Sequence, residues 1–89
     1  MNSCHLIFQG TVQGVGFRWT TRHFAHQYGL KGFVRNLPDG NVEVSVQGNR
    51  EIIEKFIQDL KNEFQGYILE VEIDWREDVG EFADFRIRF

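Results

Sequence analysis

The spacing of apolar residues changes along the chain, and each change of period predicts a new element of secondary structure. Leu6 and Phe8 lie on one face of residues 5–11, and this alternation predicts a first strand. Apolar residues then recur every three or four positions over residues 17–28, which predicts a helix. Asn49 can cap a second helix, whose apolar stripe consists of Ile52, Ile53, Phe56, Ile57, Leu60 and Phe64.

The remaining apolar segments alternate with period two, as strands do. Residues 30–36 and 41–47 flank the sequence Leu37-Pro38-Asp39-Gly40. This is a turn sequence, because Pro presets one backbone angle and Gly tolerates a positive one, so the two strands should form a hairpin. Residues 67–75 alternate most regularly, and residues 85–89 predict a short fifth strand.

The order of these elements predicts the fold class. Strand, helix, strand, strand, helix, strand and a final short strand is the split βαβ, or ferredoxin-like, arrangement. We therefore expect one α+β domain over residues 1–89. It should be a sandwich of an antiparallel sheet with both helices on one face and polar residues on the other.

Composition narrows the classes of function. The formal net charge of the 89-residue chain is −3, whereas nucleic-acid binding needs a basic surface, so we expect no nucleic-acid partner. The single cysteine, Cys4, excludes an intramolecular disulfide. No signal peptide and no apolar run of membrane-spanning length is visible, which predicts a cytoplasmic protein without a membrane partner. A monomer is the default expectation.

Candidate chemistry lies in the loop between the first strand and the first helix. Gly14 and Gly16 free the backbone for tight conformations in which successive amides can surround an anion. The N-terminus of the helix follows and adds partial positive charge. Arg18, in the first helical turn, opposes the helix dipole but offers two phosphate oxygens a planar fork. The residues alone leave an anion site and a purely structural turn both open. The loop lacks the Gly-Lys-Ser/Thr of a Walker motif and the full dinucleotide fingerprint.

Two segments carry a family resemblance. Residues 10–18, GTVQGVGFR, and residues 29–43, GLKGFVRNLPDGNVE, resemble the signature motifs of the acylphosphatase family. The resemblance spans nearly the whole chain, with one departure in residues 63–67, before the predicted fourth strand. It implies a ferredoxin-like fold, which agrees with the pattern of apolar residues.

The resemblance also implies an activity and residue roles. Acylphosphatases hydrolyse acyl phosphates to a carboxylate and inorganic phosphate, without a cofactor or a metal. The phosphate-binding arginine of the family falls on Arg18, and its water-orienting asparagine falls on Asn36. Its phosphate cradle falls on Gln13, Gly14, Val15, Gly16, Phe17 and Arg18.

The chemistry of an acyl phosphate explains why so few groups would suffice. The leaving carboxylate is already a stable anion, so no strong general acid is needed to expel it. The protein still has to hold the phosphoryl group, stabilise its charge and orient a water molecule. Backbone amides and one arginine can do the first two, and a neutral amide such as Asn36 can do the third. No acyl-specific pocket is readable, so we expect broad acceptance of small acyl groups.

Each candidate residue has a structural alternative. Without the resemblance, Asn36 is a turn or capping residue before Leu37-Pro38. His23 and His26 are three residues apart on a predicted helix, but two ligands do not make a zinc site, and structural histidines are the simpler interpretation.

Three other functions compete with the enzyme. A non-catalytic anion sensor could share the fold, although binding alone would not require Asn36. An RNA-recognition module shares the topology, but residues 41–47 contain no aromatic residue on which bases could stack. The third alternative is a domain of a larger maturation protein that handles carbamoyl phosphate. Because the sequence ends after its fifth strand, we expect a separate enzyme instead.

Overall fold

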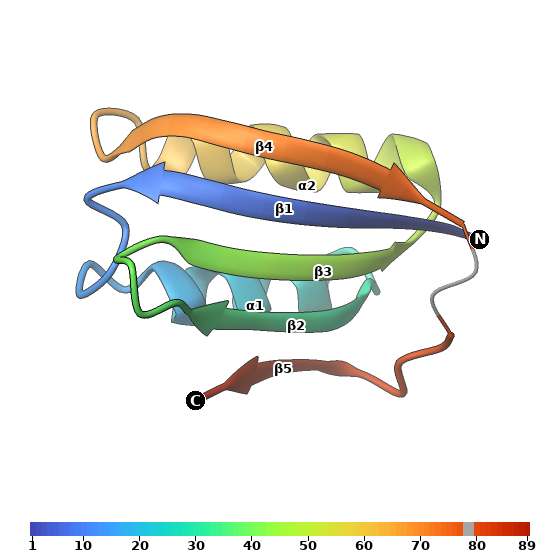
Figure 1. Cartoon of the computed structure of the whole chain (residues 1–89). Helices are drawn as coiled ribbons and strands as arrows, with labels where there is room; N and C mark the ends of the chain where they lie inside the picture. Colours follow the sequence, from blue (N-terminus) through green and yellow to red (C-terminus); the bar gives the residue numbers. More distant parts are fainter. Residues whose placement is uncertain (78–79) are drawn as a thin grey trace.

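The computed structural model describes residues 1–77 and 80–89. The elements follow one another as the apolar pattern predicts (Figure 1). In chain order they are β1 (Asn2–Gly10), α1 (Phe17–Gln27), β2 (Lys31–Asn36), β3 (Val42–Gly48), α2 (Arg50–Glu63), β4 (Ile68–Arg76) and β5 (Phe85–Arg88). The predicted ferredoxin-like α+β fold is confirmed.

The five strands form one sheet in the order β4-β1-β3-β2-β5. The first four are antiparallel to their neighbours, as expected. The expectation of an antiparallel sheet is wrong for the fifth strand, because β5 pairs with β2 in parallel and makes the sheet mixed. The path of the chain explains this pairing. β4 lies at the other edge of the sheet and runs in the direction opposite to β2. The chain then reverses direction, so β5 runs beside β2 in the same direction as β2 (Figure 1).

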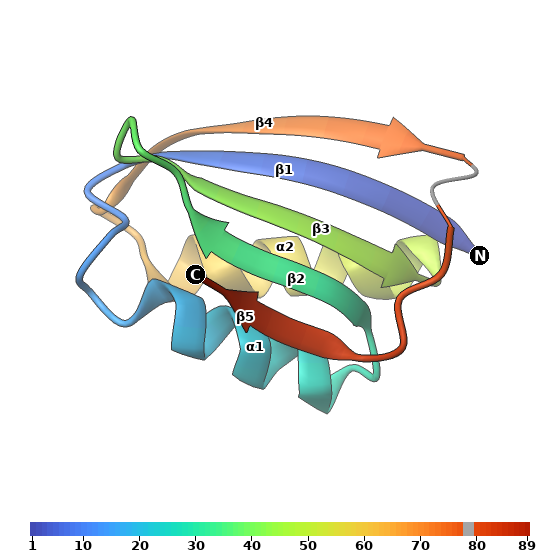
Figure 2. The ribbon, with the colours of Figure 1, turned by 60° about the horizontal axis from the view of Figure 1, so that its bottom comes forward.

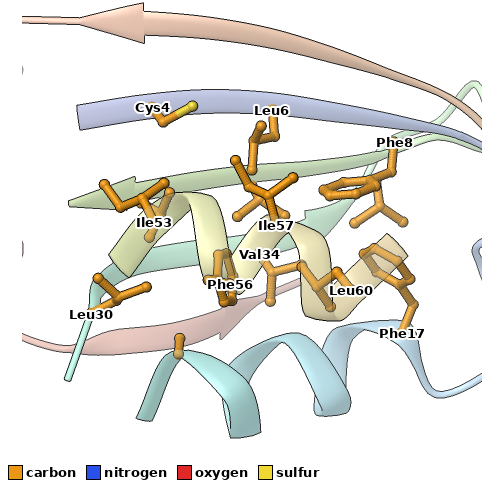
Figure 3. Packing of buried hydrophobic residues seen from close by; sticks show 14 of the residues in the cluster. Cys4, Leu6, Phe8, Phe17, Leu30, Val34, Ile53, Phe56, Ile57 and Leu60 are labelled. Carbon is orange, nitrogen blue, oxygen red and sulfur yellow. The ribbon is translucent and has the colours of Figure 1, made fainter. Parts of the chain in front are cut away.

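Both helices cover one face of the sheet (Figure 2). The inward residues of β1 are Cys4, Leu6 and Phe8, and they lie above Ile53 and Ile57 of α2 (Figure 3). Each of the three strand residues is at most 1% exposed. Burial raises the pKa of the Cys4 thiol to about 11, so this cysteine is a packing residue and not a nucleophile. No helix in residues 1–77 and 80–89 has the length and hydropathy needed to cross a bilayer.

The edge strand β4 is less buried than its regular alternation suggests. Val71 and Trp75 are partly buried and pack on the core, but Leu69 is 86% exposed. An edge strand has a neighbour on one side only. The pairing of β4 with β1 also shifts register between Gln9 and Gly10, so that Gly10 lies opposite Ile68, which packs on the core. Alternation therefore predicted the inner face of β4 at Val71 and Trp75 but failed at Leu69, where the register shift puts Ile68 on the core instead.

Gly32 in β2 offers a stability test of this packing. Its φ is 141°, and a Cβ at this position would overlap the backbone carbonyl of Ser45 in β3. Gly29 has a φ of 67° with open space around it. We expect Gly32→Ala to lower the free energy of unfolding by more than about 4 kcal/mol, the range of severe core damage. Gly29→Ala should cost about 1–2 kcal/mol, the penalty of a left-handed conformation. Urea unfolding of both variants measures the difference, and equal costs would contradict the close approach of β2 to β3.

Candidate active site

The loop that follows β1 leads into a helix N-terminus with free backbone donors. Gly14 and Gly16 have φ of 77° and 80°, in the left-handed region that favours glycine. Gly16 is the N-cap of α1, so no side chain caps the helix, and its first turn contains no acidic residue. Within the described part of the chain, no amide of residues 13–19 donates a backbone hydrogen bond, and Thr20 is the first to do so, to Gly16. These amides and the positive end of the helix dipole make a site for an anion.

Phe17 fixes this loop to the body of the protein. It is 1% exposed, and its ring packs between Phe8, with the centroids 4.9 Å apart, and Phe64, at 4.7 Å. The hydroxyl of Thr21 donates to the carbonyl of Phe17 at 2.7 Å. The start of α1 is therefore held against β1 and the end of α2, which sets the position of the neighbouring residue, Arg18.

Asn36 is the last residue of β2 and lies on the face covered by the helices. It is two residues after the buried Val34, whereas Arg35 points to the open face and pairs with Glu43 there. The side-chain oxygen Oδ1 of Asn36 is buried and accepts no hydrogen bond from the described residues. Buried acceptors are almost always satisfied, so an orphan at a cavity wall indicates a place where a ligand or water donates.

The structure brings Arg18 and Asn36 to the same cavity. Figures 1 and 2 show the reason: the loop after β1, the end of β2 and the end of β5 all lie at one end of the molecule. The cavity has a volume of about 170 Å³, below the roughly 300–1,000 Å³ of pockets for drug-sized ligands, so it suits a small molecule. Its lining consists of Val12, Gly14, Gly16, Phe17, Arg18, Trp19, Asn36, Ile87 and Phe89.

Two residues of the predicted cradle do not line the cavity. The side chain of Gln13 turns away and donates to the carbonyls of Leu37, at 2.8 Å, and Asn41, at 2.9 Å. Val15 packs against the core. For these two residues, only the main-chain amides are available to a ligand. Gln13 instead ties the loop to the β2–β3 turn, directly after Asn36.

These two hydrogen bonds predict that Gln13 positions the loop after β1 relative to Asn36 at the end of β2. Gln13→Met keeps the length of the side chain but removes both donors. We expect kcat for an acyl phosphate to fall roughly 10- to 100-fold, because small displacements of positioned groups carry penalties of this size. The inhibition constant of inorganic phosphate should change much less, since Arg18 and the amides lie on one continuous segment.

The matched control is Gln9→Met. The Gln9 side chain lies on the open face of the sheet and donates to Glu72 of β4 at 3.2 Å, so its hydrogen bond does not tie β1 to the β2–β3 turn. This variant should retain wild-type kinetics. A Gln13→Met enzyme with unchanged kcat would contradict the positioning role.

Comparison with known proteins identifies the family. A model of the acylphosphatase family matches residues 4–87. The chain belongs to the acylphosphatase family. Membership makes it a hydrolase and confirms the identification made from the two sequence motifs. The chain is 46% identical over 85 residues to the acylphosphatase of Pyrobaculum islandicum, covering 93% of this chain and 90% of that protein.

Solved structures agree with this assignment. The crystal structure of acylphosphatase from Bacillus subtilis matches with a TM-score of 0.93 and 28% identity over 100% of both chains. The crystal structure of T. kodakarensis HypF matches with a TM-score of 0.85 and 35% identity, but this chain covers only 12% of that one. The fold of this acylphosphatase-family chain is therefore also found as part of a much longer protein.

Four residues of the cavity wall escaped the sequence analysis. Val12 and Trp19 flank the cradle, but valine and tryptophan are by default interpreted as packing residues. Ile87 and Phe89 belong to the last apolar alternation, so their shared face was readable. What the sequence could not supply is the parallel pairing of β5 with β2, which places Ile87 opposite Val34 and brings this face to the cavity. Within this family site, the guanidinium of Arg18 lies 4.9 Å from the centroid of the Phe89 ring.

The histidines have structural partners. The ring of His23 stacks on Trp19 with the centroids 5.1 Å apart, and Nε2 of His26 is 3.1 Å from the carbonyl of Phe85. His5 is 2.7 Å from Glu43 on the open face of the sheet. Burial alone would raise the pKa of Glu43, but hydrogen bonds from His5 and Arg35 hold it below its usual value. Residues 1–77 and 80–89 contain no group of three potential metal ligands.

Proposed function

We propose that this enzyme hydrolyses acyl phosphates by direct in-line attack of water on phosphorus. The loop amides of residues 13–18 and the guanidinium of Arg18 bind the phosphoryl group, and Asn36 orients the water. The observation that carries the proposal is the cavity shared by Arg18, Asn36 and the two left-handed glycines. A phosphoryl group bound at the helix N-terminus would lie within reach of both side chains.

Binding of the phosphoryl group is supported by the supply of donors. The amides at the start of α1 have no partner among the described residues, and the helix dipole adds positive potential. Arg18 contributes a fork of N–H groups that matches two phosphoryl oxygens. Because these donors are fixed by Phe17 and by the helix, they need little reorganisation as charge spreads over the oxygens in the transition state.

Orientation of the water is supported by the orphan acceptor of Asn36. A water that donates to the buried Oδ1 would satisfy this atom and would have its lone pair free for phosphorus. The water oxygen forms the new P–O bond while the bond to the acyl oxygen breaks, and its electron pair leaves with the carboxylate. The proton of the water passes to a phosphoryl oxygen of the substrate. The products are a carboxylate and inorganic phosphate.

The chemistry of the cavity wall fits a reaction without a protein base. Among the described residues that line the cavity, none is Asp, Glu or His, so Arg18 is its only ionisable side chain. A carboxylate here would repel the phosphoryl group, and a general acid is not required for a carboxylate leaving group. The charge of the wall therefore favours anionic substrates and leaves proton transfer to the substrate itself.

The test is hydrolysis of benzoyl phosphate in the presence of a chelator. We expect turnover that EDTA does not reduce and that inorganic phosphate inhibits competitively, because the product occupies the same donors. Phosphate binding without turnover would contradict the proposal and support an anion sensor. The cytoplasmic location and the monomeric state remain predictions from the sequence.

A further inference from the structure

The cavity has an apolar wall that phosphoryl binding does not require. Trp19, Ile87 and Phe89 line it beside Arg18. Trp19 is 56% exposed and Phe89 is fully exposed, although water-exposed aromatic rings contribute nothing to the core. Large apolar side chains gathered at the mouth of a small polar site indicate a surface that a ligand covers.

Two of the three side chains, those of Trp19 and Ile87, are held by protein neighbours before any ligand arrives. Trp19 stacks on His23, one helical turn further along α1, with an angle of 10° between the rings. Ile87 is partly buried against the core, in β5 where it pairs with Val34. The Phe89 ring lies against the guanidinium of Arg18. A ligand that contacts Trp19 and Ile87 would therefore bind a surface that is already ordered, which lowers the entropic cost of binding.

The position of the wall indicates its occupant. The acyl group is covalently attached to the phosphoryl group, so it must occupy the space next to the cradle. The side chains there are apolar, and none of them carries a carboxylate. An aromatic or other apolar acyl group would bury its surface against Trp19 and Phe89, whereas an acetyl group is too small to contact both.

We infer that Trp19, Ile87 and Phe89 form an acyl-binding subsite that makes this enzyme prefer aromatic acyl phosphates to acetyl phosphate. The inference rests on the proposed hydrolysis of acyl phosphates and adds a specificity to it. It narrows the sequence-based expectation of broad acceptance of small acyl groups. Apolar pockets discriminate by roughly 10- to 200-fold for differences of a methylene group, so a preference of at least tenfold is expected.

The experiment compares benzoyl phosphate with acetyl phosphate in the wild type, Trp19→Ala, Phe89→Ala and Phe89→Leu. The measured quantity is the ratio of the two kcat/KM values, because changes in this ratio between variants cancel the intrinsic reactivity of each substrate. We expect both alanine variants to lower the ratio at least about tenfold. Phe89→Leu keeps an apolar side chain without a ring and should give an intermediate ratio.

A control separates the subsite from other roles of the same residues. Leu69→Ala removes another exposed apolar residue, on β4 and outside the cavity, and should keep the wild-type ratio. The inhibition constant of inorganic phosphate should stay within about threefold in Trp19→Ala and Phe89→Ala, because the cradle itself is intact.

Two results would overturn the inference, and they differ from failure of the proposed function. An unchanged ratio in both alanine variants would show that the wall does not contact the acyl group. Equal losses for both substrates together with weaker phosphate inhibition would show that Phe89 only supports Arg18. A wild-type enzyme that hydrolyses neither substrate would instead remove the proposed function, and the subsite with it.

Discussion

Arg18→Ala is expected to lower kcat/KM for benzoyl phosphate by roughly 10²–10³-fold or more, the penalty for removing one preorganised donor to a developing anion. Removing Arg18 should lower the activity more than removing a neutral donor would, because the hydrogen bonds of Arg18 to phosphate are charge-assisted. It is also the only ionisable side chain among the described residues of the cavity wall, so no neighbouring charge replaces it. The inhibition constant of phosphate should rise in parallel, since the same contacts bind the product.

Arg22 provides a matched control. It is an arginine of the same helix, one turn after Arg18, and it does not line the phosphoryl cavity. Arg22→Ala should change kcat/KM by less than about threefold, because Arg22 lies outside the cavity and makes no direct contact with a phosphoryl group bound there. Arg18→Lys should be intermediate, because lysine restores the charge but not the fork. Equal losses in Arg18→Ala and Arg22→Ala would reduce the role of Arg18 to general electrostatic attraction.

Asn36→Ala is expected to lower kcat by about 10²-fold while the inhibition constant of phosphate changes less than about threefold. The reason is a division of labour: the amides and Arg18 hold the phosphoryl group, and Asn36 acts on the water alone. The folded state should tolerate the substitution, because it removes a buried acceptor that lacks a partner among the described residues. Steady-state kinetics with benzoyl phosphate and a thermal melt measure both effects.

Asn62 serves as the control for this substitution. It lies on the exposed side of α2, where its side chain accepts a hydrogen bond from Gln58 at 3.1 Å. Asn62→Ala should leave kcat and phosphate inhibition unchanged. A large rise of the phosphate inhibition constant in Asn36→Ala would contradict the separate roles, as it would place Asn36 among the groups that bind phosphate.

The apolar pattern was sufficient to predict the fold because each period reflects one local geometry. The stripe from Ile52 to Phe64 is buried almost throughout, and the inward residues of β1 are Leu6 and Phe8 as expected. The direction of β5 was not predictable in the same way. Parallel and antiparallel pairing bury the same face of a short strand, so only the path of the whole chain decides between them.

The sequence allowed only the polar residues and the glycines of the site to be predicted. Arg18 is unfavourable at a helix N-terminus, and Gly14 and Gly16 mark a special backbone, so these positions differ from what folding alone would select. The side chain of Gln13 could not be assigned, because its partners are main-chain carbonyls 24 and 28 residues away. Trp19 and Phe89 gave no signal, since an apolar residue is by default a core residue.

The structure also suggests why the helix α1 begins as it does. Its N-cap is a glycine without a capping side chain, and its first turn carries Arg18 and no acidic residue. A capping side chain typically stabilises a helix by about 1 kcal/mol. It would also occupy the amides of the first turn. The local sequence therefore gives up helix stability and keeps these donors free for an anion.

The most direct test of the central claim is an NMR titration of the ¹⁵N-labelled protein with inorganic phosphate. The account predicts that the amide resonances of residues 13–19 shift together and saturate with one Kd, equal to the inhibition constant of phosphate. The side-chain amide of Asn36 should respond in the same titration, and Arg18→Ala should abolish the saturable shifts. Saturable shifts that cluster elsewhere on the protein, or none at millimolar phosphate, would contradict a phosphoryl site at the N-terminus of α1.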